Sequence, residues 1–315
     1  MMLKKLIPAA AVLALAGAAQ AQVSVYGLLD LSYGKSLADD ATNKKANIHS
    51  GADNGGSQGN SVSRVGIKGT TDLAPGIKGN FKLETGGIDL DGKVNGGDGP
   101  FFYRQAWAGV TGGFGEVRVG RDDDVIFQTF IGFDMNGAAN MASAGGNTGL
   151  GILGNGRVSR QVQYISPAFG GFSAHVAHAP QDSEIVGAKA FSSFALKYTA
   201  GALSLALANE GKRTSTDEAN MLYAGSYDFG VAKLAVMNSQ TKGAKGTQYG
   251  ISAPVAGLTV GMQYAKNDSN KEKGTEFFVN KEIFKNTVAY MDIGSKKAAN
   301  GTKTNGYAVG AIYVF

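Results

Sequence analysis

Apolar and polar residues alternate along most of the chain, in segments of about ten residues separated by clusters of Gly, Asn, Asp and Lys. In the first such segment the apolar residues share one parity: Val23, Val25, Leu29, Leu31 and Tyr33. The same alternation returns in four clear segments: 77–84, 203–208, 258–264 and 307–315. A period of two predicts β-strands, each with one apolar and one polar face.

The N-terminus has a different pattern. Lys4 and Lys5 precede an uninterrupted small and apolar run over 6–19, and the sequence Ala-Gln-Ala follows at 19–21. A charged start, a short apolar stretch and a small-residue site are typical of a cleaved secretory signal. The run is shorter than the roughly 20 residues that span a bilayer, which argues against a membrane anchor. We therefore expect residues 1–21 to be a signal peptide and residues 22–315 to form the exported domain.

Short and long connections alternate between these segments. Short turns such as 73–76 and 112–115 are separated by long polar stretches such as 36–60 and 211–220. This layout is typical of an outer-membrane β-barrel, whose closure pairs every backbone N–H and C=O group in lipid. At about 18 residues for a strand and its connection, the exported domain predicts an all-β, antiparallel transmembrane barrel on the order of 16 strands.

A soluble β-sandwich or lectin is the alternative fold. Aromatic residues gather near the expected strand ends, as they do at membrane interfaces: Phe169, Phe172, Phe194, Tyr198, Tyr223, Tyr227 and Phe229. The last residue, Phe315, also lies on an apolar parity. Both observations favour the membrane barrel.

Composition excludes several classes of protein. The chain has no Cys, so disulfides, Cys-ligated zinc, iron–sulfur clusters and thiol catalysis are excluded. Glycine accounts for 47 of 315 residues without the three-residue period of collagen. Loss of Lys4 and Lys5 with the signal lowers the formal net charge from +5 to +3, which does not favour nucleic-acid binding.

Motifs that suggest an enzyme or a metal site are isolated. Gly149, Gly151 and Gly154 match a dinucleotide fingerprint, but no strand–helix unit surrounds them. His175 and His178 are three residues apart and would lie on opposite faces of a strand. We therefore expect no enzyme activity, no cofactor and no metal. Weak cation binding by the loop carboxylates of Asp89 and Asp91 remains open.

Five stretches resemble one family when taken in order: SRVGIKGTTDLAPGIKGNFKLET (63–85), RQAWAG (104–109), GFGEVRVGR (113–121), SPAFGGF (166–172) and the ending at 307–315. They are similar to the trimeric general porins of Gram-negative bacteria, especially the beta-proteobacterial subgroup. The resemblance implies a 16-stranded homotrimer among the lipids and lipopolysaccharide of the outer membrane, with the third long loop folded into the lumen. It also implies that Phe315 belongs to the signal read by the barrel-insertion machinery.

About 36 residues between Gly120 and Arg157 lack a strand pattern, which is long for a loop without a function. This stretch carries four carboxylates that could face a pore: Asp122, Asp123, Asp124 and Asp134. It could be a solvated surface loop or an eyelet that narrows the channel. The resemblance favours the eyelet.

Basic residues within the expected strands should face the lumen, because a cation facing lipid at the midplane costs about 2–4 kcal/mol. By parity these include Arg64, Lys68, Lys82 and Arg118. The resemblance implies a basic cluster beside the eyelet formed by Arg64, Arg104 and Arg157, with Arg118 as a further member. Trp107 is assigned to the apolar face. Gln105 and Arg160 have the parity of apolar neighbours and fit the pattern poorly.

These expectations together predict passive diffusion of small hydrophilic solutes through a water-filled pore with a mild preference for anions. Two alternatives remain open. One is a channel of the same architecture biased toward phosphate or organic acids. The other is an outer-membrane protease or lipase, although no nucleophile–base pair is evident.

Overall fold

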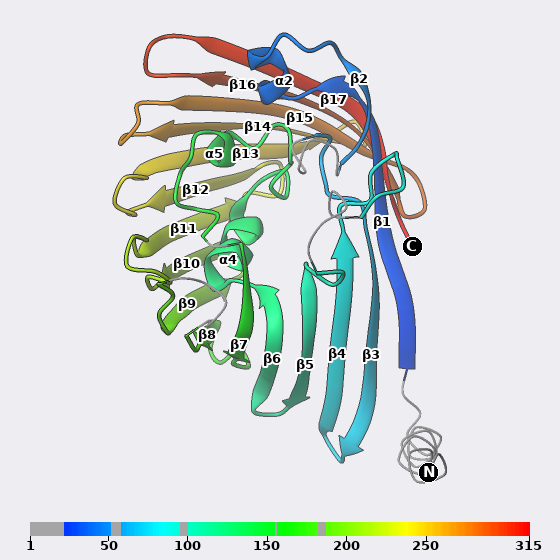
Figure 1. The fold of residues 1–315 in the computed structure, drawn as a ribbon, viewed down its shortest axis with the longest axis vertical. Helices are drawn as coiled ribbons and strands as arrows, with labels where there is room; N and C mark the ends of the chain where they lie inside the picture. The colour runs from blue at the N-terminus through cyan, green and yellow to red at the C-terminus, as the bar shows by residue number, and fades with distance from the viewer. Residues whose placement is uncertain (1–21, 52–57, 95–99, 155, 182–186) are drawn as a thin grey trace.

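The computed structural model describes residues 22–315 except 52–57, 95–99, 155 and 182–186. The expected signal peptide lies outside the described residues. The wall is one antiparallel sheet that closes on itself, since β1 (Gln22–Lys35) pairs with both β17 (Lys303–Val314) and β3 (Arg64–Ala74) (Figure 1). A seventeenth strand, β2 (Asn47–Ser50), is short and pairs beside β1. The predicted 16-stranded barrel is confirmed.

The other strands of the wall follow one another around the barrel. They are β4 (Ile77–Gly86), β5 (Gln105–Gly112), β6 (Gly115–Asp123), β7 (Arg157–Ile165), β8 (Phe172–Ala179), β9 (Phe191–Ala200), β10 (Leu203–Glu210), β11 (Asn220–Asp228), β12 (Lys233–Ser239), β13 (Gly246–Val255), β14 (Leu258–Asn267), β15 (Lys273–Phe284) and β16 (Thr287–Lys297). Neighbouring strands pair antiparallel, so each hairpin contributes its hydrogen bonds to the closed wall.

Opposite faces of the wall differ as the alternation predicts. On β1, Val25 and Leu31 are 64% and 51% exposed on the outside, whereas Asp30 and Ser32 are buried on the inside. The last strand repeats this arrangement, with exposed Val309 and buried Ala308. An apolar exterior and a polar interior suit a barrel that stands in lipid. No helix in the described residues is long and apolar enough to cross a membrane.

The seam between the first and last strands is completed by Phe315. The backbone N–H of Gly27 donates to the Phe315 carbonyl at 2.9 Å, and the N–H of Phe315 donates back to Gly27 at 3.1 Å. A Cβ at position 27 would lie 2.3 Å from the Phe315 ring, so the ring rests directly on the glycine backbone. The terminal aromatic residue therefore packs where the barrel closes.

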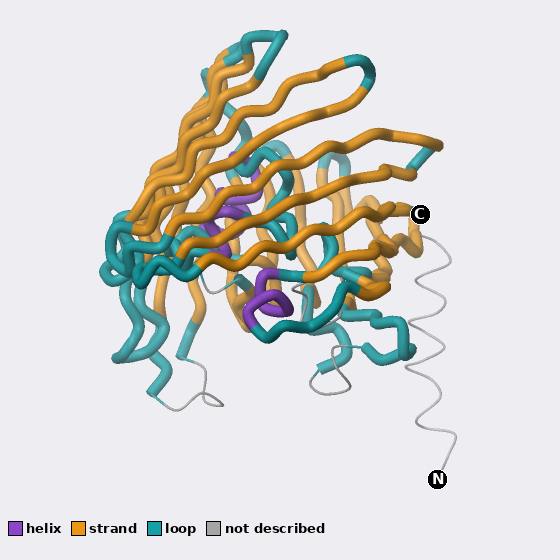
Figure 2. Tube along the Cα trace, turned by 90° about the horizontal axis from the view of Figure 1, so that it is seen from above, coloured by secondary structure: helices purple, strands orange, loops and turns teal. Residues whose placement is uncertain are grey.

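Residues 124–156, here called the inner segment, connect β6 to β7 and contain two helices, α4 (Val125–Phe133) and α5 (Ala144–Asn147). The alternation predicts no helix here; α4 is short and almost wholly apolar, so its sequence has no helical period to read. Val125, Ile126 and Phe130 of α4 are buried against small and apolar side chains of the wall. Figure 1 labels the two helices, and Figure 2 draws them in purple, together with α2 (Leu37–Ala41), in the space that the strands surround.

Contacts of the two helices with the wall fall on one side of the barrel. The helix α4 contacts β8 to β12, and α5 contacts β13 to β16. Ala195, Ala208 and Leu222 form the wall surface beneath α4. This packing leaves space between the inner segment and the strands β3 to β7.

The two faces of β13 provide a test of the membrane orientation. We expect Ile251→Arg, on the outward face near the middle of the strand, to lower the free energy of unfolding by about 2–4 kcal/mol. Ser252→Arg, directed inward toward Met135, should cost less than about 1 kcal/mol, because its charge remains in the lumen. Urea unfolding in lipid vesicles measures both. Equal losses would contradict the assigned orientation.

Candidate pore constriction

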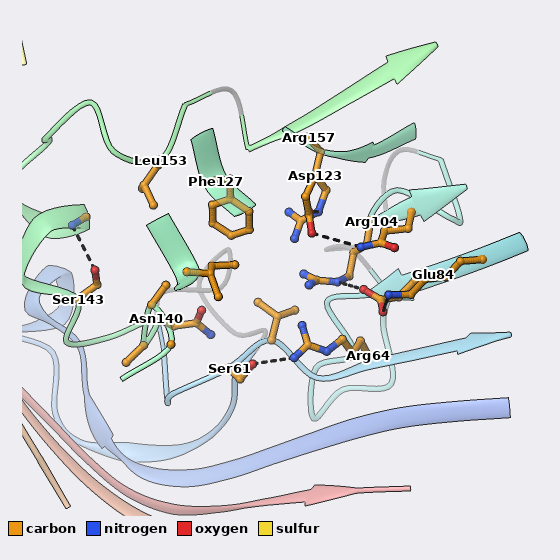
Figure 3. A pocket seen from close by; sticks show the side chains of 18 of the residues that line it. Ser61, Arg64, Glu84, Arg104, Asp123, Phe127, Asn140, Ser143, Leu153 and Arg157 are labelled. Carbon is orange, nitrogen blue, oxygen red and sulfur yellow. Dashed lines mark hydrogen bonds and ion pairs between the residues drawn. The ribbon is translucent and has the colours of Figure 1, made fainter. Parts of the chain in front are cut away.

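A cavity of about 700 Å³ lies between the inner segment and strands β3 to β7. We call it the constriction cavity. Its charged lining residues are Arg64, Lys82, Glu84, Arg104, Asp123 and Arg157 (Figure 3). The inner segment contributes neutral lining residues, including Ser143, Asn140 and Leu153. Four cations thus face two carboxylates, which leaves an excess of two positive charges.

Glu84 organises the part of this lining nearest β4. The Nε atom of Arg104 donates to one Glu84 carboxylate oxygen at 2.6 Å, and the hydroxyl of Tyr26 donates to the other at 2.7 Å. Arg104 precedes β5, and its backbone N–H donates to the Glu84 carbonyl, so main chain and side chain hold it in place together. Hydrogen bonds from charged donors are stronger than neutral ones, so this pair fixes the Arg104 guanidinium at the cavity wall.

A second ion pair joins the ends of β6 and β7. The Nε atom of Arg157 lies 3.1 Å from a carboxylate oxygen of Asp123. The other oxygen of Asp123 accepts a hydrogen bond from Gln105 at 3.2 Å, and the Arg157 guanidinium lies 5.8 Å from the centre of the Phe127 ring. These contacts place Arg157 between the wall and α4.

Arg64 is held by a neutral partner. Its guanidinium donates to the hydroxyl of Ser61 at 3.1 Å, and it has no ion-pair partner in the part of the chain that the structure describes. Arg64 therefore contributes a positive charge that no ion pair neutralises. The structure thus brings together five of the residues selected from the sequence: Arg64, Lys82, Arg104, Arg157 and Asp123.

Arg118 lies outside the constriction cavity. It donates to both Glu116 and Asp122 at 2.9 Å, and its guanidinium lies 4.4 Å from the centre of the Trp107 ring. Lys68 lines a neighbouring recess that is described below. Both residues face the lumen, nearer the short turns than the constriction cavity.

The remaining acidic residues selected from the sequence anchor the chain. Asp122 binds Arg118, Asp124 begins α4, and Asp134 accepts hydrogen bonds from Gln248 and Gln263 at about 3 Å. Of the three consecutive aspartates only Asp123 lines the constriction cavity. The side chains of three consecutive residues at the end of a strand point in different directions. Composition alone therefore could not show which of the three aspartates faces the cavity.

Buried carboxylates opposite the basic wall attach the inner segment, and also residues 60 and 61, to the barrel. The side-chain N–H₂ group of Asn136 donates to both Glu276 and Asp292 at 2.9 Å. Asp30 accepts from the hydroxyl of Tyr290 at 2.6 Å and from the backbone N–H groups of 60 and 61. These buried acids are satisfied by hydrogen bonds, as burial of polar groups requires.

Trp107 corrects the expectation that it faces lipid. It pairs directly with Lys82 across β4 and β5, and residues opposite each other on antiparallel strands share a face. Its indole N–H donates to Gln105, which also faces inward. Arg160 has a positive φ of 58° where the register between β6 and β7 shifts, and this bulge explains its parity.

Two residues that line the constriction cavity, Glu84 and Tyr26, were not selected from the sequence. Glu84 shares the inward parity of Lys82, so alternation could have identified it. Tyr26 looked like one more aromatic residue of a strand, and only the closure between β1 and β3 brings it beside Glu84.

The histidines and loop acids carry no comparable site. His175 is buried against Gln163, and His178 is exposed beside Ser192, so they lie on opposite faces as predicted. Asp89 accepts hydrogen bonds from the backbone N–H groups of Asp91 and Lys93, which close its loop. The described residues contain no group of three or more His, Asp or Glu side chains that could hold a metal ion.

Comparison with known proteins shows the family to which this closed barrel belongs. A family model described as Gram-negative porin matches residues 9–315. The chain belongs to the Gram-negative porin family. This porin is accordingly an outer-membrane channel and not an enzyme.

Relatives of this porin match over most of its length. It is 32% identical to outer membrane porin protein 32 of Delftia acidovorans, over 94% of this chain and 87% of the relative. It is 30% identical to an outer membrane porin of Bordetella pertussis, over 76% and 70% of the two chains. A solved anion-selective porin from Comamonas acidovorans superposes with a TM-score of 0.76 at 23% identity, covering 94% of this chain and 100% of that chain, which shows a shared fold.

Asp124 caps the inner segment of the porin. Its carboxylate accepts a hydrogen bond from the backbone N–H of Phe127 at 2.6 Å, and a Cβ at Gly154 would lie 2.7 Å from both Asp124 and Glu210. The two carboxyl groups are thus close neighbours. Burial, together with the negative charge of Glu210 and to a smaller extent Asp123, raises the pKa of Asp124 to about 8.

This raised pKa predicts that the inner segment loosens as pH rises. Between the ordinary carboxyl pKa and about 8 the docked segment binds a proton that the undocked segment releases, so docking weakens with increasing pH. We expect hydrogen-exchange protection of 125–133 to fall by about tenfold or more from pH 5 to pH 8. Asp124→Asn, which retains a good capping side chain, should abolish this dependence.

The control is Asp228→Asn at an exposed turn, which should behave like the unmodified porin. Protection that falls equally with pH in Asp124→Asn would show that another group governs docking.

Proposed function

We propose that this porin is a general diffusion channel, filled with water, through which small hydrophilic solutes and ions pass passively with a mild preference for anions. The observation that supports this most directly is the excess of two positive charges lining the constriction cavity. A ring of basic side chains favours anions, and a barrel of 16 strands is wide enough for an aqueous pore.

The pairing pattern explains why the preference should be mild. Glu84 and Asp123 form ion pairs with Arg104 and Arg157, whereas Arg64 forms no ion pair among the described residues. Charges at such a site act over a Debye length of about 8 Å at physiological salt. Selectivity should therefore weaken as the salt concentration rises.

We also propose that the inner segment is the eyelet of the channel. Support comes from its contacts, since α4 and α5 pack against the strands from β8 to β16 and restrict the open lumen to the side of β3 to β7. Asp123, the last residue of β6, would supply an acidic side chain next to the eyelet, beside the basic side chains of the wall.

The assembled form should be a homotrimer in contact with outer-membrane lipids and lipopolysaccharide, after a signal peptide is cleaved behind Ala21. The apolar exterior supports contact with lipid or with other subunits. Phe315 should serve recognition by the barrel-insertion machinery, in addition to its packing on Gly27.

An organic-acid channel is the second candidate function. A recess next to the constriction cavity combines two lysines with aromatic side chains, and this chemistry would suit anions with an apolar body. The following subsection develops this observation.

Reversal potentials in a salt gradient test the proposed anion preference. We expect a reversal potential shifted toward anions for the porin, in three equal conductance steps if it is a trimer. Arg64→Gln should lower the anion-to-cation permeability ratio about twofold, and Glu84→Gln should raise it about twofold. This is the effect of one charge at about 8 Å in water after screening by salt over one Debye length. Lys78→Gln, at the exposed end of β4, is the matched control.

A clear cation preference of the unmodified channel would refute the proposal. So would changes of the same sign in Arg64→Gln and Glu84→Gln, because these variants remove opposite charges.

Substitution of the last residue tests the proposed assembly signal. Phe315→Ala should reduce the amount of porin in the outer membrane several-fold, whereas Phe284→Ala, an exposed aromatic residue at a short turn, should not. Refolding of both variants in detergent separates recognition from packing. If Phe315→Ala refolds normally and also accumulates normally in cells, Phe315 is not part of the signal.

A further inference from the structure

A second recess, of about 400 Å³, adjoins the constriction cavity on the side of the β3–β4 turn. It is lined mainly by Tyr26, Lys68, Thr70, Asn80, Lys82 and Trp107. Tyr26 and Lys82 line both spaces, so a solute leaving the constriction cavity meets this recess directly. Its volume lies in the range of small-molecule pockets.

Two like charges face each other across this recess. Lys68 on β3 and Lys82 on β4 are direct partners in the strand register. Like charges placed opposite each other destabilise a sheet, so this arrangement opposes folding rather than supporting it. An anion held between the two ammonium groups would relieve the repulsion.

Neighbouring carboxylates offset this charge only in part. Lys82 lies 3.6 Å from Glu84, and that carboxylate already accepts hydrogen bonds from Arg104 and Tyr26. Lys68 has no ion-pair partner among the residues that the structure describes. The recess therefore keeps a net positive charge.

The ring of Tyr26 positions both ammonium groups. The Nζ atoms of Lys68 and Lys82 lie 5.1 and 5.4 Å from its centre. A Cβ at Gly66 would lie 2.5 Å from the same ring, so the ring is pressed against β3 and presents its other face to the lysines. A cation–π contact attracts a cation without neutralising it, so both charges remain available to a solute.

Trp107 supplies a flat apolar wall next to Lys82. Its indole N–H donates to Gln105 at 3.1 Å, and Arg118 lies over its ring at 4.4 Å. These two contacts hold the ring in one orientation. A fixed aromatic surface beside two ammonium groups matches a solute that has a planar apolar body and one negative end.

We propose that this recess is a binding station for aromatic carboxylates, which rest there after passing the constriction cavity. The carboxylate lies between Lys68 and Lys82, and the aromatic ring lies against Trp107. This proposal adds a binding site to the proposed anion channel and rests on that function, because a solute reaches the station only through an open pore. It gives the channel a bias toward aryl acids over other anions of equal charge.

Block of the chloride current by added carboxylates tests the station in planar bilayers. Benzoate, cyclohexanecarboxylate and acetate carry the same charge at neutral pH and differ in their bodies. We expect the half-blocking concentration of benzoate to be about tenfold lower than that of acetate, with cyclohexanecarboxylate in between. Equal block by all three, or equal block by benzoate and cyclohexanecarboxylate, would overturn the aromatic station.

Variants assign the block to named side chains. Lys68→Gln should raise the half-blocking concentration of benzoate about fivefold, and Trp107→Leu should bring benzoate close to acetate. Lys78→Gln removes a lysine farther along β4, where it pairs with Asp72, and should leave the block unchanged. If Lys78→Gln matches Lys68→Gln, the effect is general electrostatics and the station is refuted.

The unblocked chloride current separates this proposal from the proposed function. Anion-shifted reversal without preferential benzoate block refutes the station and leaves the anion channel intact. Cation-shifted reversal refutes the anion channel itself. Circular dichroism of Trp107→Leu in lipid vesicles, with the β-strand content of the unmodified porin, shows that the variant has folded.

Discussion

Closure of the backbone hydrogen bonds is the constraint on which the rest of this porin depends. In lipid an unpaired N–H or C=O group costs several kcal/mol, so the sheet must have no free edge. Here β1 meets both β3 and β17, and Phe315 completes the seam by packing on Gly27. Closure also fixes the faces: once the apolar parity points to lipid, the polar parity must line an interior.

The interior is then divided by packing. The apolar helix α4 finds small wall residues such as Ala195 and Ala208, and Asn136 binds the buried acids Glu276 and Asp292. Both kinds of contact hold the inner segment to the same side of the barrel. The opposite side, from β3 to β7, stays open, and the lining cations of the constriction cavity lie there.

The basic residues in this open part fall into two groups, according to the partners that hold them. Arg104 and Arg157 are fixed by carboxylates, which makes their geometry definite and reduces their net field. Arg64 and Lys68 are placed by a hydroxyl group and an aromatic ring instead, which leaves their charge intact. The lumen therefore contains arginines in fixed positions and also keeps a net positive potential.

The sequence by itself determined the strands, their two faces and their approximate number, because a period of two is a local property of each strand and closure in lipid allows few alternatives. It also indicated Arg64, Arg104 and Arg157, partly through parity and partly through resemblance. The separate positions of Asp122, Asp123 and Asp124 needed the tertiary structure, because three adjacent carboxylates have the same composition whichever way they point. The inward face of Trp107 also needed the tertiary structure, because it depends on the cross-strand register with Lys82. The same holds for the helix α4, which is stabilised by the strands β8 to β12, and these lie far from it in the sequence.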